Sequence, residues 1–306
     1  MTEVTSNIVV LFSIMIISYL AKQAKLIPKN TAQVLTPLLI NITLPALIFS
    51  SITSGPNLEI LVESLPLIGI SFGYYIVASL AASLYFKKLP QKSKRAGVFA
   101  YATIFSNTAF IGLPLCSLIF GEPGVVLGSL YDFVQTIFMY TVGIAFMSGQ
   151  EKGLVKTLRD QLKEPPVIGL LAGLLTLFLG LKIPGIILEP IKMLGSINAV
   201  LAMFAVGQYF QLHCFKEFDR LKKLVPLVAL KLLIIPLLVL GIAGFLPLTP
   251  QSKGVLAIMI ASPTGILTAV FAEKYKQDYE FAVMAVVAAT GLSIITLPVM
   301  LSLLHF

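Results

Sequence analysis

Two short polar stretches interrupt long apolar runs of this 306-residue chain, and they hold side chains suited to binding a ligand. The first runs from Phe105 to Leu115 and the second from Ala261 to Thr268. Each contains both a glycine and a proline, namely Gly112, Pro114, Pro263 and Gly265. Inside a helix, a proline removes one backbone donor and its ring clashes with the carbonyl four residues before it. Each stretch is therefore expected to break a helix, and in lipid a break persists only where it lines a cavity or is covered by protein.

A helix that restarts after such a break presents free N–H groups and the positive end of its dipole, which suits an anionic group of a substrate. The amide of Asn107 and the hydroxyls of Thr108 and Thr264 stand beside the two breaks as further hydrogen-bonding groups. Asn107 lies about twelve residues into its apolar run, which is about 18 Å of helix and close to the centre of a bilayer. The alternative is that the prolines and glycines only kink packing helices, as is common in membranes.

Ionisable side chains inside apolar runs are the second candidate for function. Asp132 and Lys231 lie well away from the ends of their runs, where a charge is costly and usually marks a pathway, a proton relay or an ion pair. Lys231 is a candidate for attracting a substrate carboxylate, and Asp132 for carrying a coupling proton, with Gln135 about one helical turn from it. A mutual pair or a lysine that extends to the interface is the structural alternative. Glu63 is a weaker candidate, equally compatible with an interfacial charge.

The composition places these groups in an integral membrane protein. Hydrophobic residues make up 57% of the chain and charged residues 12%, with a mean hydropathy of +0.95, whereas soluble domains have about 25% charged residues. Long apolar runs favour helices over a barrel, whose strands would alternate over about ten residues. The net charge of +8 is not gathered into a basic, aromatic-interleaved domain, so nucleic acid is not expected as a partner. The two cysteines and two histidines lack metal-ligand spacing, and the sequence lacks nucleophile-elbow and zinc-protease motifs, which argues against an enzyme, a metal or a cofactor.

A bilayer is spanned by about 20 apolar residues, and this length divides the chain into ten predicted transmembrane helices. The first five cover residues 7–24, 31–52, 59–86, 96–120 and 125–147. The other five cover residues 165–181, 186–212, 221–246, 251–274 and 278–304. The polar interval 148–164 is predicted to be a cytoplasmic loop between two five-helix halves, residues 1–147 and 165–306.

Charge and internal similarity together predict how the two halves are oriented. Most lysines and arginines fall in the loops on one side, which the positive-inside rule makes cytoplasmic, so both termini are expected on the outer side of the cell membrane. Short matches recur in order, for example Lys25–Pro28 with Leu181–Pro184, and Ser106–Ala109 with Ser262–Gly265. Because each half has an odd number of spans, the second must enter the membrane with opposite polarity. The expected fold is therefore all-α, with two inverted five-helix repeats and broken helices four and nine crossing at the midplane, as in many secondary transporters.

Several motifs, taken in order, resemble those of the auxin efflux carrier family, which includes plant auxin exporters and bacterial organic-acid permeases. They are Asn107-Thr108, Gly112-Leu113-Pro114-Leu115, Gln135 with Tyr140-Thr141, Ala202-Met203-Phe204 with Gly207, and Pro263 followed by Val270-Phe271-Ala272 and Glu273-Lys274-Tyr275. The resemblance covers nearly the whole chain and implies a ten-helix fold of the bile-acid/sodium symporter-like superfamily. It further implies a scaffold of helices one, two, six and seven, often dimeric, and a transport domain of helices three to five and eight to ten that moves like an elevator.

One departure from the family bears on the substrate. Plant members carry a carboxylate and a lysine near the start of helix three, where this chain has Glu63 but also Leu67, and their long cytoplasmic loop is absent here. A small carboxylate such as malate or malonate is therefore at least as plausible a substrate as an auxin-like acid. The leading prediction is an elevator-type secondary transporter of small organic anions that binds substrate at the crossing, with a proton or sodium as the coupling ion if there is one. The alternatives are a sodium-coupled bile-acid-type symporter and a membrane receptor that binds an organic anion without transporting it.

Overall fold

The computed structural model describes residues 2–28, 30–54, 59–86, 94–148, 159–160, 162–209 and 218–303. These residues form helices joined by turns, and the β-structure among them is an isolated bridge. The first half contains α1 (Thr2–Gln23), α2 (Thr31–Leu38), η1 (Leu39–Thr43), α3 (Leu44–Ser54), α4 (Glu59–Phe86), α5 (Lys94–Ile104), η2 (Thr108–Gly112), α6 (Leu113–Phe138), η3 (Met139–Gly143) and α7 (Ile144–Ser148), where η denotes a π-helical turn. The second half contains α9 (Pro165–Phe178), α10 (Gly185–Ser196), α11 (Asn198–Tyr209), α12 (Phe218–Ala229), η5 (Leu230–Ile234), α13 (Ile235–Ala243), α14 (Pro250–Ala261), α15 (Leu267–Lys274) and α16 (Tyr279–Ser302).

The helices have the length and surface of membrane spans. Six described runs are long and apolar enough to cross a bilayer, namely Thr31–Ser54, Ser64–Leu84, Thr108–Ser148, Gly185–Tyr209, Lys222–Ala243 and Tyr279–Ser302. Large apolar side chains face outward on them, among them Val77 on α4, Ile186 on α10 and Leu238 on α13, a surface that soluble monomers rarely expose over a contiguous area. The prediction of an all-helical integral membrane protein is confirmed. Each of the ten predicted ranges contains helix, but the ten-span inverted repeat itself stays a prediction.

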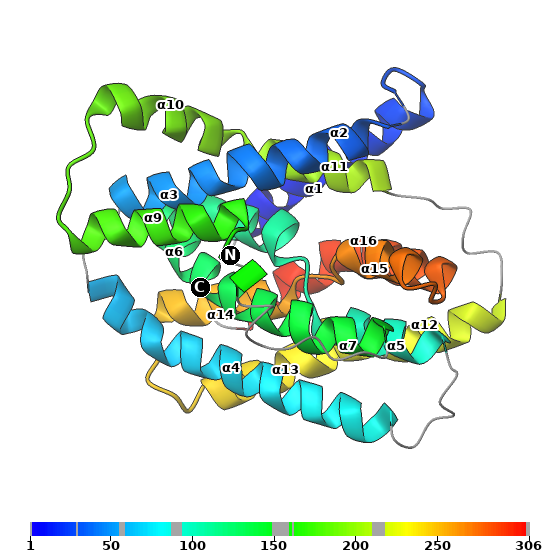
Figure 1. Ribbon diagram of the computed structural model, residues 1–306. Coiled ribbons are helices and arrows are strands. Elements are labelled where there is room, and N and C mark those ends of the chain that lie inside the picture. Colours follow the sequence, from blue (N-terminus) through cyan, green and yellow to red (C-terminus); the bar gives the residue numbers. More distant parts are fainter. Residues whose placement is uncertain are drawn as a thin grey trace.

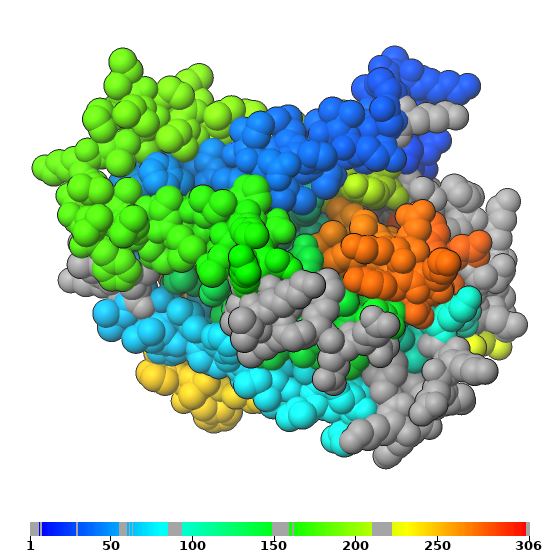
Figure 2. All heavy atoms as spheres, viewed as in Figure 1, coloured from blue at the N-terminus to red at the C-terminus, as the bar shows by residue number. Residues whose placement is uncertain are grey.

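Two groups of helices lie side by side (Figure 1). In the first group α1 packs on α11, and α3 packs on α9 and α10. The second group holds α4 to α7 and α12 to α16, in which α6 packs on α4 and α14, and α15 packs on α16. In the space-filling view α2, α3, α9 and α10 form one side of the molecule and α4 the opposite side (Figure 2). These groups contain the helices that the family resemblance implies for a scaffold and a transport domain, and both the two domains and their separate movement stay predictions.

Close backbone contact holds the first group together. A Cβ atom built on Gly207 of α11 would lie 2.3 Å from the backbone oxygen of Met15 in α1, so only a glycine permits this approach. Beside it, the Gln208 amide donates hydrogen bonds to the backbone oxygen and to the hydroxyl of Ser18, at 2.7 and 2.6 Å. Small residues and side-chain amides are the usual means of joining helices in lipid, where burial of apolar surface provides little driving force.

Three of the π-helical turns end two residues before a proline. The turns end at Thr43, Gly112 and Ile234, and the prolines are Pro45, Pro114 and Pro236. A proline cannot donate a backbone hydrogen bond and crowds the carbonyl four residues earlier, and the wider π-turn relieves both problems. The predicted break around Gly112 and Pro114 is therefore accommodated within the helix, and the helix is instead interrupted earlier, at Phe105–Asn107.

Gly121 marks the point at which two predicted spans meet inside α6. Its φ of +62° and ψ of −148° interrupt the helical backbone, and a glycine adopts such a conformation without strain. The chain continues as helix on both sides of Gly121. The short loop predicted between helices four and five is thus a sharp change of backbone direction.

Candidate functional site

The structure brings the two polar stretches together. The chain is unwound between α5 and η2, and again between α14 and α15, and Ser106 and Thr264 form an antiparallel β-bridge at the point where these segments meet. The N–H of Asn107 donates to the carbonyl of Pro263 at 2.7 Å, and the N–H of Gly265 donates to the carbonyl of Phe105 at 3.3 Å. We call this pair of unwound segments, Phe105–Asn107 and Ser262–Ile266, the crossing.

Gln135 of α6 clamps the crossing from one side. Its Oε1 accepts a hydrogen bond from the N–H of Ser106, and its Nε2 donates to the carbonyl of the same residue, both at 3.1 Å. Nε2 also donates to the Thr108 hydroxyl at 2.5 Å, and Oε1 accepts from the Tyr75 hydroxyl at 2.7 Å. The side chain of Gln135 is 2% exposed, so its amide has all of its hydrogen-bonding capacity satisfied inside the protein. It serves Ser106 as a neighbouring strand would.

The two intramembrane charges are attached to opposite ends of this network. The Thr108 hydroxyl donates a short hydrogen bond to Asp132 Oδ1. Lys231 Nζ donates to the hydroxyl of Ser106 at 2.5 Å. Within the described part of the chain neither charge forms a salt bridge, so Asp132 and Lys231 are linked through Thr108, Gln135 and Ser106 instead of directly.

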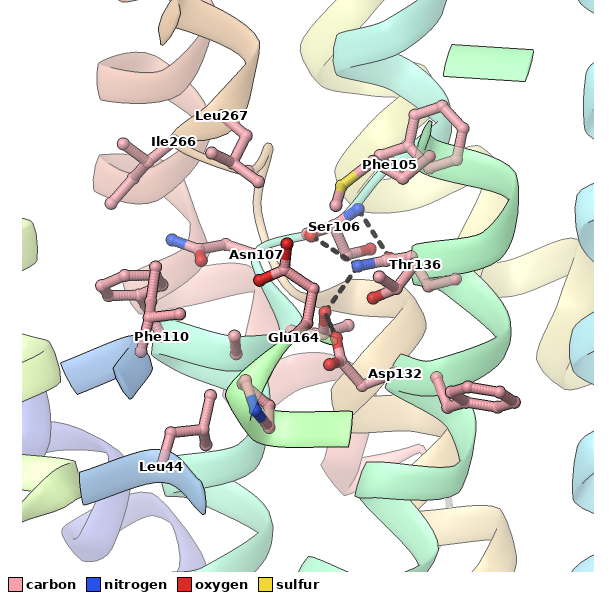
Figure 3. Close-up of a pocket in the computed structure, with 18 of the residues that line it drawn as sticks. Leu44, Phe105, Ser106, Asn107, Phe110, Asp132, Thr136, Glu164, Ile266 and Leu267 are labelled. Atoms are coloured by element: carbon pink, nitrogen blue, oxygen red, sulfur yellow. Dashed lines mark hydrogen bonds between the residues drawn. The ribbon is translucent and has the colours of Figure 1, made fainter. Parts of the chain in front are cut away.

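A cavity of about 140 Å³ lies against the crossing, between the two groups of helices. The first group contributes apolar side chains of η1, α3 and α9, including Ile40, Leu44 and Leu170, and the hydroxyl groups of Thr36 and Tyr209. The second group contributes the segments Phe105–Phe110 and Gly265–Leu267 together with one face of α6. An apolar cavity of about 150 Å³ holds a benzene molecule, so this one has room for a small organic molecule. Figure 3 shows Asn107, Asp132 and Glu164 around it.

Hydrogen-bond donors converge on this cavity from both unwound segments. Thr108–Phe110 begin the restarted helix at η2 and Leu267 begins α15, and their N–H groups have no partner within their own helix, whereas the N–H of Gly265 is bonded to the carbonyl of Phe105. The side chain of Asn107 is 4% exposed, and its Nδ2 has no hydrogen-bond partner. An unpaired buried donor costs about 1–3 kcal/mol. Two helix N-termini and one unsatisfied amide therefore favour an oxygen-bearing, anionic group in the cavity.

The residues singled out from the sequence separate into two sets. Those that line the cavity are Asn107, Thr108, Asp132, Gln135 and Gly265. Those that do not are Gly112, Pro114, Pro263, Thr264 and Lys231. Gly112 packs against Met259 and Ser262, and the Thr264 hydroxyl donates to the carbonyl of Ala102, so these residues support the crossing from within. The side chain of Glu63 lies outside the described part of the structure.

Glu164 is a cavity residue that sequence reasoning missed. The sequence predicts it at the end of the polar inter-repeat loop, but it stands as the residue before α9, half-buried and lining the cavity. A signal was present in the sequence, because Pro165-Pro166 after a charged residue marks a helix start at the membrane boundary. That Glu164 reaches the cavity follows only from the way α9 packs on α3 beside α6.

Comparison with known proteins identifies the family. A family described as "Membrane transport protein" matches residues 3–301. The chain belongs to the membrane transport protein family. This match confirms the resemblance to the auxin efflux carrier-like proteins that the motifs indicate, and membership of this family assigns the chain to transporters and not to enzymes.

Relatives within the membrane transport protein family align over nearly their full length. An uncharacterized transporter of Methanocaldococcus jannaschii is 22% identical over 95% of each chain. An uncharacterized transporter of Methanothermobacter thermautotrophicus is 25% identical over 97% of this chain and 96% of its own. A protein of Rhizobium meliloti named "Putative malonate transporter" is 24% identical over 100% of this chain and 97% of its own. The crossing and the cavity thus belong to a membrane transporter.

Proposed function

We propose that this protein is a secondary transporter of small organic anions and that the cavity beside the crossing is its substrate site. The observation that carries the proposal is the buried, unpaired Nδ2 of Asn107 next to two helix N-termini. A carboxylate oxygen at this place accepts from the amide of Asn107 and from the N–H groups at the start of η2, which removes the cost of the unsatisfied donor. The relative from Rhizobium meliloti, named for malonate, supports a small carboxylate as the class of substrate.

The charged residues that line the cavity limit the ionisation state in which the acid binds. Asp132 and Glu164 are in the cavity lining, and no lysine or arginine is among the described residues that line it. Two carboxylates repel a dianion strongly in a low-dielectric site. We therefore propose that the site takes a monocarboxylate, or a dicarboxylate that retains one proton, with its ionised end at Asn107 and its other end toward Asp132 and Glu164. Asp132 is then the group closest to any proton that travels with the acid.

The position of the cavity supports an elevator-like mechanism. Its walls come from both helix groups, so sliding of α4–α7 and α12–α16 along the other group carries the crossing, with its ligand, across the bilayer. In this proposal α1–α3 and α9–α11 form a fixed scaffold in the cell membrane, a surface through which two copies of the chain pair, and both termini face outward. Broken helices at a midplane site are the recurring device of such transporters.

Uptake by proteoliposomes tests the site assignment. Wild-type protein, Asn107→Ala and Asn198→Ala are compared with labelled malonate, malate and indole-3-acetate. Loss of a hydrogen bond to a charged group costs about 1.5–3 kcal/mol, so Asn107→Ala is expected to lower uptake about tenfold or more. Asn198 is a matched control, because it is also buried with an unpaired Nδ2 but accepts from Thr43 at 2.9 Å and does not line the cavity.

The Asn198→Ala control, together with uptake measured with and without sodium, decides between the possible outcomes. Asn198→Ala is expected to lose thermal stability and to retain uptake. Equal uptake by all three proteins, or an equal loss in both variants, contradicts the assignment of the site to the cavity. Uptake by the wild type that requires sodium indicates a sodium-coupled symporter of the bile-acid type, and binding of an acid without any uptake indicates a receptor.

A further inference from the structure

The ammonium group of Lys231 is buried at the crossing, but Lys231 does not line the cavity. Lys231 lies in η5, the π-helical turn between α12 and α13, and its side chain is 0% exposed. Its Nζ donates to the Ser106 hydroxyl at 2.5 Å, and that hydroxyl lies 3.5 Å from the carbonyl of Ile260. No carboxylate forms a salt bridge with Lys231 among the described residues. A charge without a counter-ion at this depth is costly and requires a reason.

The reason lies in the two helices that end at the crossing. α5 ends at Ile104 and α14 at Ala261, and η5 packs against both. Helix C-termini carry a partial negative charge and carbonyl groups without intrahelical partners. Side chains satisfy several of these carbonyls, because Thr264 donates to Ala102 at 2.9 Å and Tyr74 donates to Ile104 at 2.9 Å. Each of these neutral hydroxyls donates a hydrogen bond to a carbonyl oxygen but adds no positive charge. The partial negative charge of the two helix C-termini therefore remains.

Transporters with broken helices place a coupling cation at such half-helix C-termini. We propose that the ammonium of Lys231 takes the place of that cation, as a positive charge supplied by the chain itself. The crossing is then electrostatically complete without sodium, and Lys231 is a positioning residue that fixes Ser106 and the two helix ends. The proposal rests on the proposed transport function and adds that this transport does not require sodium. It also predicts that shortening Lys231 creates a site for a small monovalent cation next to the Ser106 hydroxyl.

Two sets of measurements on the full-length protein test this inference. Thermal unfolding is measured for the wild type, Lys231→Ala, Lys231→Arg and Lys231→Met in sodium, ammonium or choline chloride at one ionic strength and one pH. Malonate uptake is measured in the same salts. For the wild type we expect the same melting temperature and the same uptake in sodium and in choline. In choline, Lys231→Ala is expected to lose uptake by about tenfold, within the usual range of coupling between sites.

Small cations should restore what the alanine variant has lost. Sodium or ammonium is expected to raise both the melting temperature and the uptake of Lys231→Ala, and neither should change the wild type. Lys231→Arg is expected to keep most of its uptake, since it retains the charge. The proposal is overturned by wild-type uptake that requires sodium, by wild-type-like uptake of Lys231→Ala in choline, or by a folded alanine variant that no small cation stabilises.

Two further arrangements keep the test decisive. If Lys231→Ala does not fold in any of the salts, Lys231→Met is used, because it keeps the side-chain volume without the charge and buried ion sites often tolerate such a replacement. Loss of uptake at an unchanged melting temperature then supports the proposal, and wild-type uptake refutes it. If the wild type transports none of the acids, the transport proposal fails by itself, and the salt dependence of the melting temperatures still decides on Lys231.

Discussion

Replacement of Gln135 by leucine is the sharpest test of how the crossing is held. The Gln135 amide makes four hydrogen bonds, two with the backbone of Ser106, one with Thr108 and one with Tyr75. Side-chain hydrogen bonds inside membrane proteins contribute about 0.6 kcal/mol each on average, which predicts a loss of about 2–3 kcal/mol for Gln135→Leu. With an unfolding entropy of about 2.1 cal/mol/K per residue, the melting temperature is expected to fall by about 4 °C.

Function should suffer more than stability in this variant. Ser106 and Thr108 lose the group that fixes them relative to each other, so the restarted helix and the amide of Asn107 lose their alignment with the cavity. A misplacement of this kind at a binding site costs far more than the bonds themselves. Gln135→Leu is therefore expected to lose stabilisation by malonate in a thermal-shift experiment.

Unfolding is followed through a cysteine thiol, because the chain has no tryptophan whose fluorescence would report it. Cys116 is free and 0% exposed, so a thiol-reactive dye labels it only on unfolding, in a Cys214→Ser background. Gln208→Leu is the matched control, since it loses two amide hydrogen bonds to Ser18 at a site outside the cavity. It should lower the melting temperature by about half as much and leave the malonate effect intact. A melting temperature of Gln135→Leu within about 1 °C of the wild-type value would refute the role of Gln135 in holding the crossing. An equal loss of the malonate effect in both variants would refute it as well.

Two further predictions concern stability alone and use the same assay. Asp278 accepts from the N–H of Phe281 at 3.1 Å and pairs with Arg95 at 2.8 Å, so Asp278→Ala should cost about 1–2 kcal/mol, and Asp278→Asn about half of that because asparagine keeps the cap. Equal losses in the two variants would show that the cap contributes nothing. Gly207→Ala should lower the melting temperature more than Gly291→Ala, because the new Cβ meets the Met15 backbone at 2.3 Å in the first variant and nothing within 4 Å in the second. Equal melting temperatures would contradict a tight α1–α11 contact.

The sequence predicts those features that depend on local chemistry. Hydropathy alone indicates helical membrane spans, because a backbone in lipid must satisfy its hydrogen bonds within itself. The range predicted for the third span, residues 59–86, agrees with the observed α4, Glu59–Phe86. Proline and glycine mark both polar stretches, and the ordered motifs indicate the family. Asn107, Thr108, Asp132, Gln135 and Gly265 are both predicted from the sequence and found at the cavity.

The tertiary structure decides what depends on packing between distant segments. Pro114 predicts a break, but the π-turn at η2 absorbs it, and the unwound residues are those that pair with Pro263–Gly265. Glu164 enters the cavity because α9 packs on α3, and Lys231 binds Ser106 because η5 packs on α5 and α14. Hydropathy and helix propensity describe the free energy of placing one segment in lipid or in a helix. They do not determine which partner a buried polar group meets, because that partner is brought within hydrogen-bonding distance by the whole arrangement of helices.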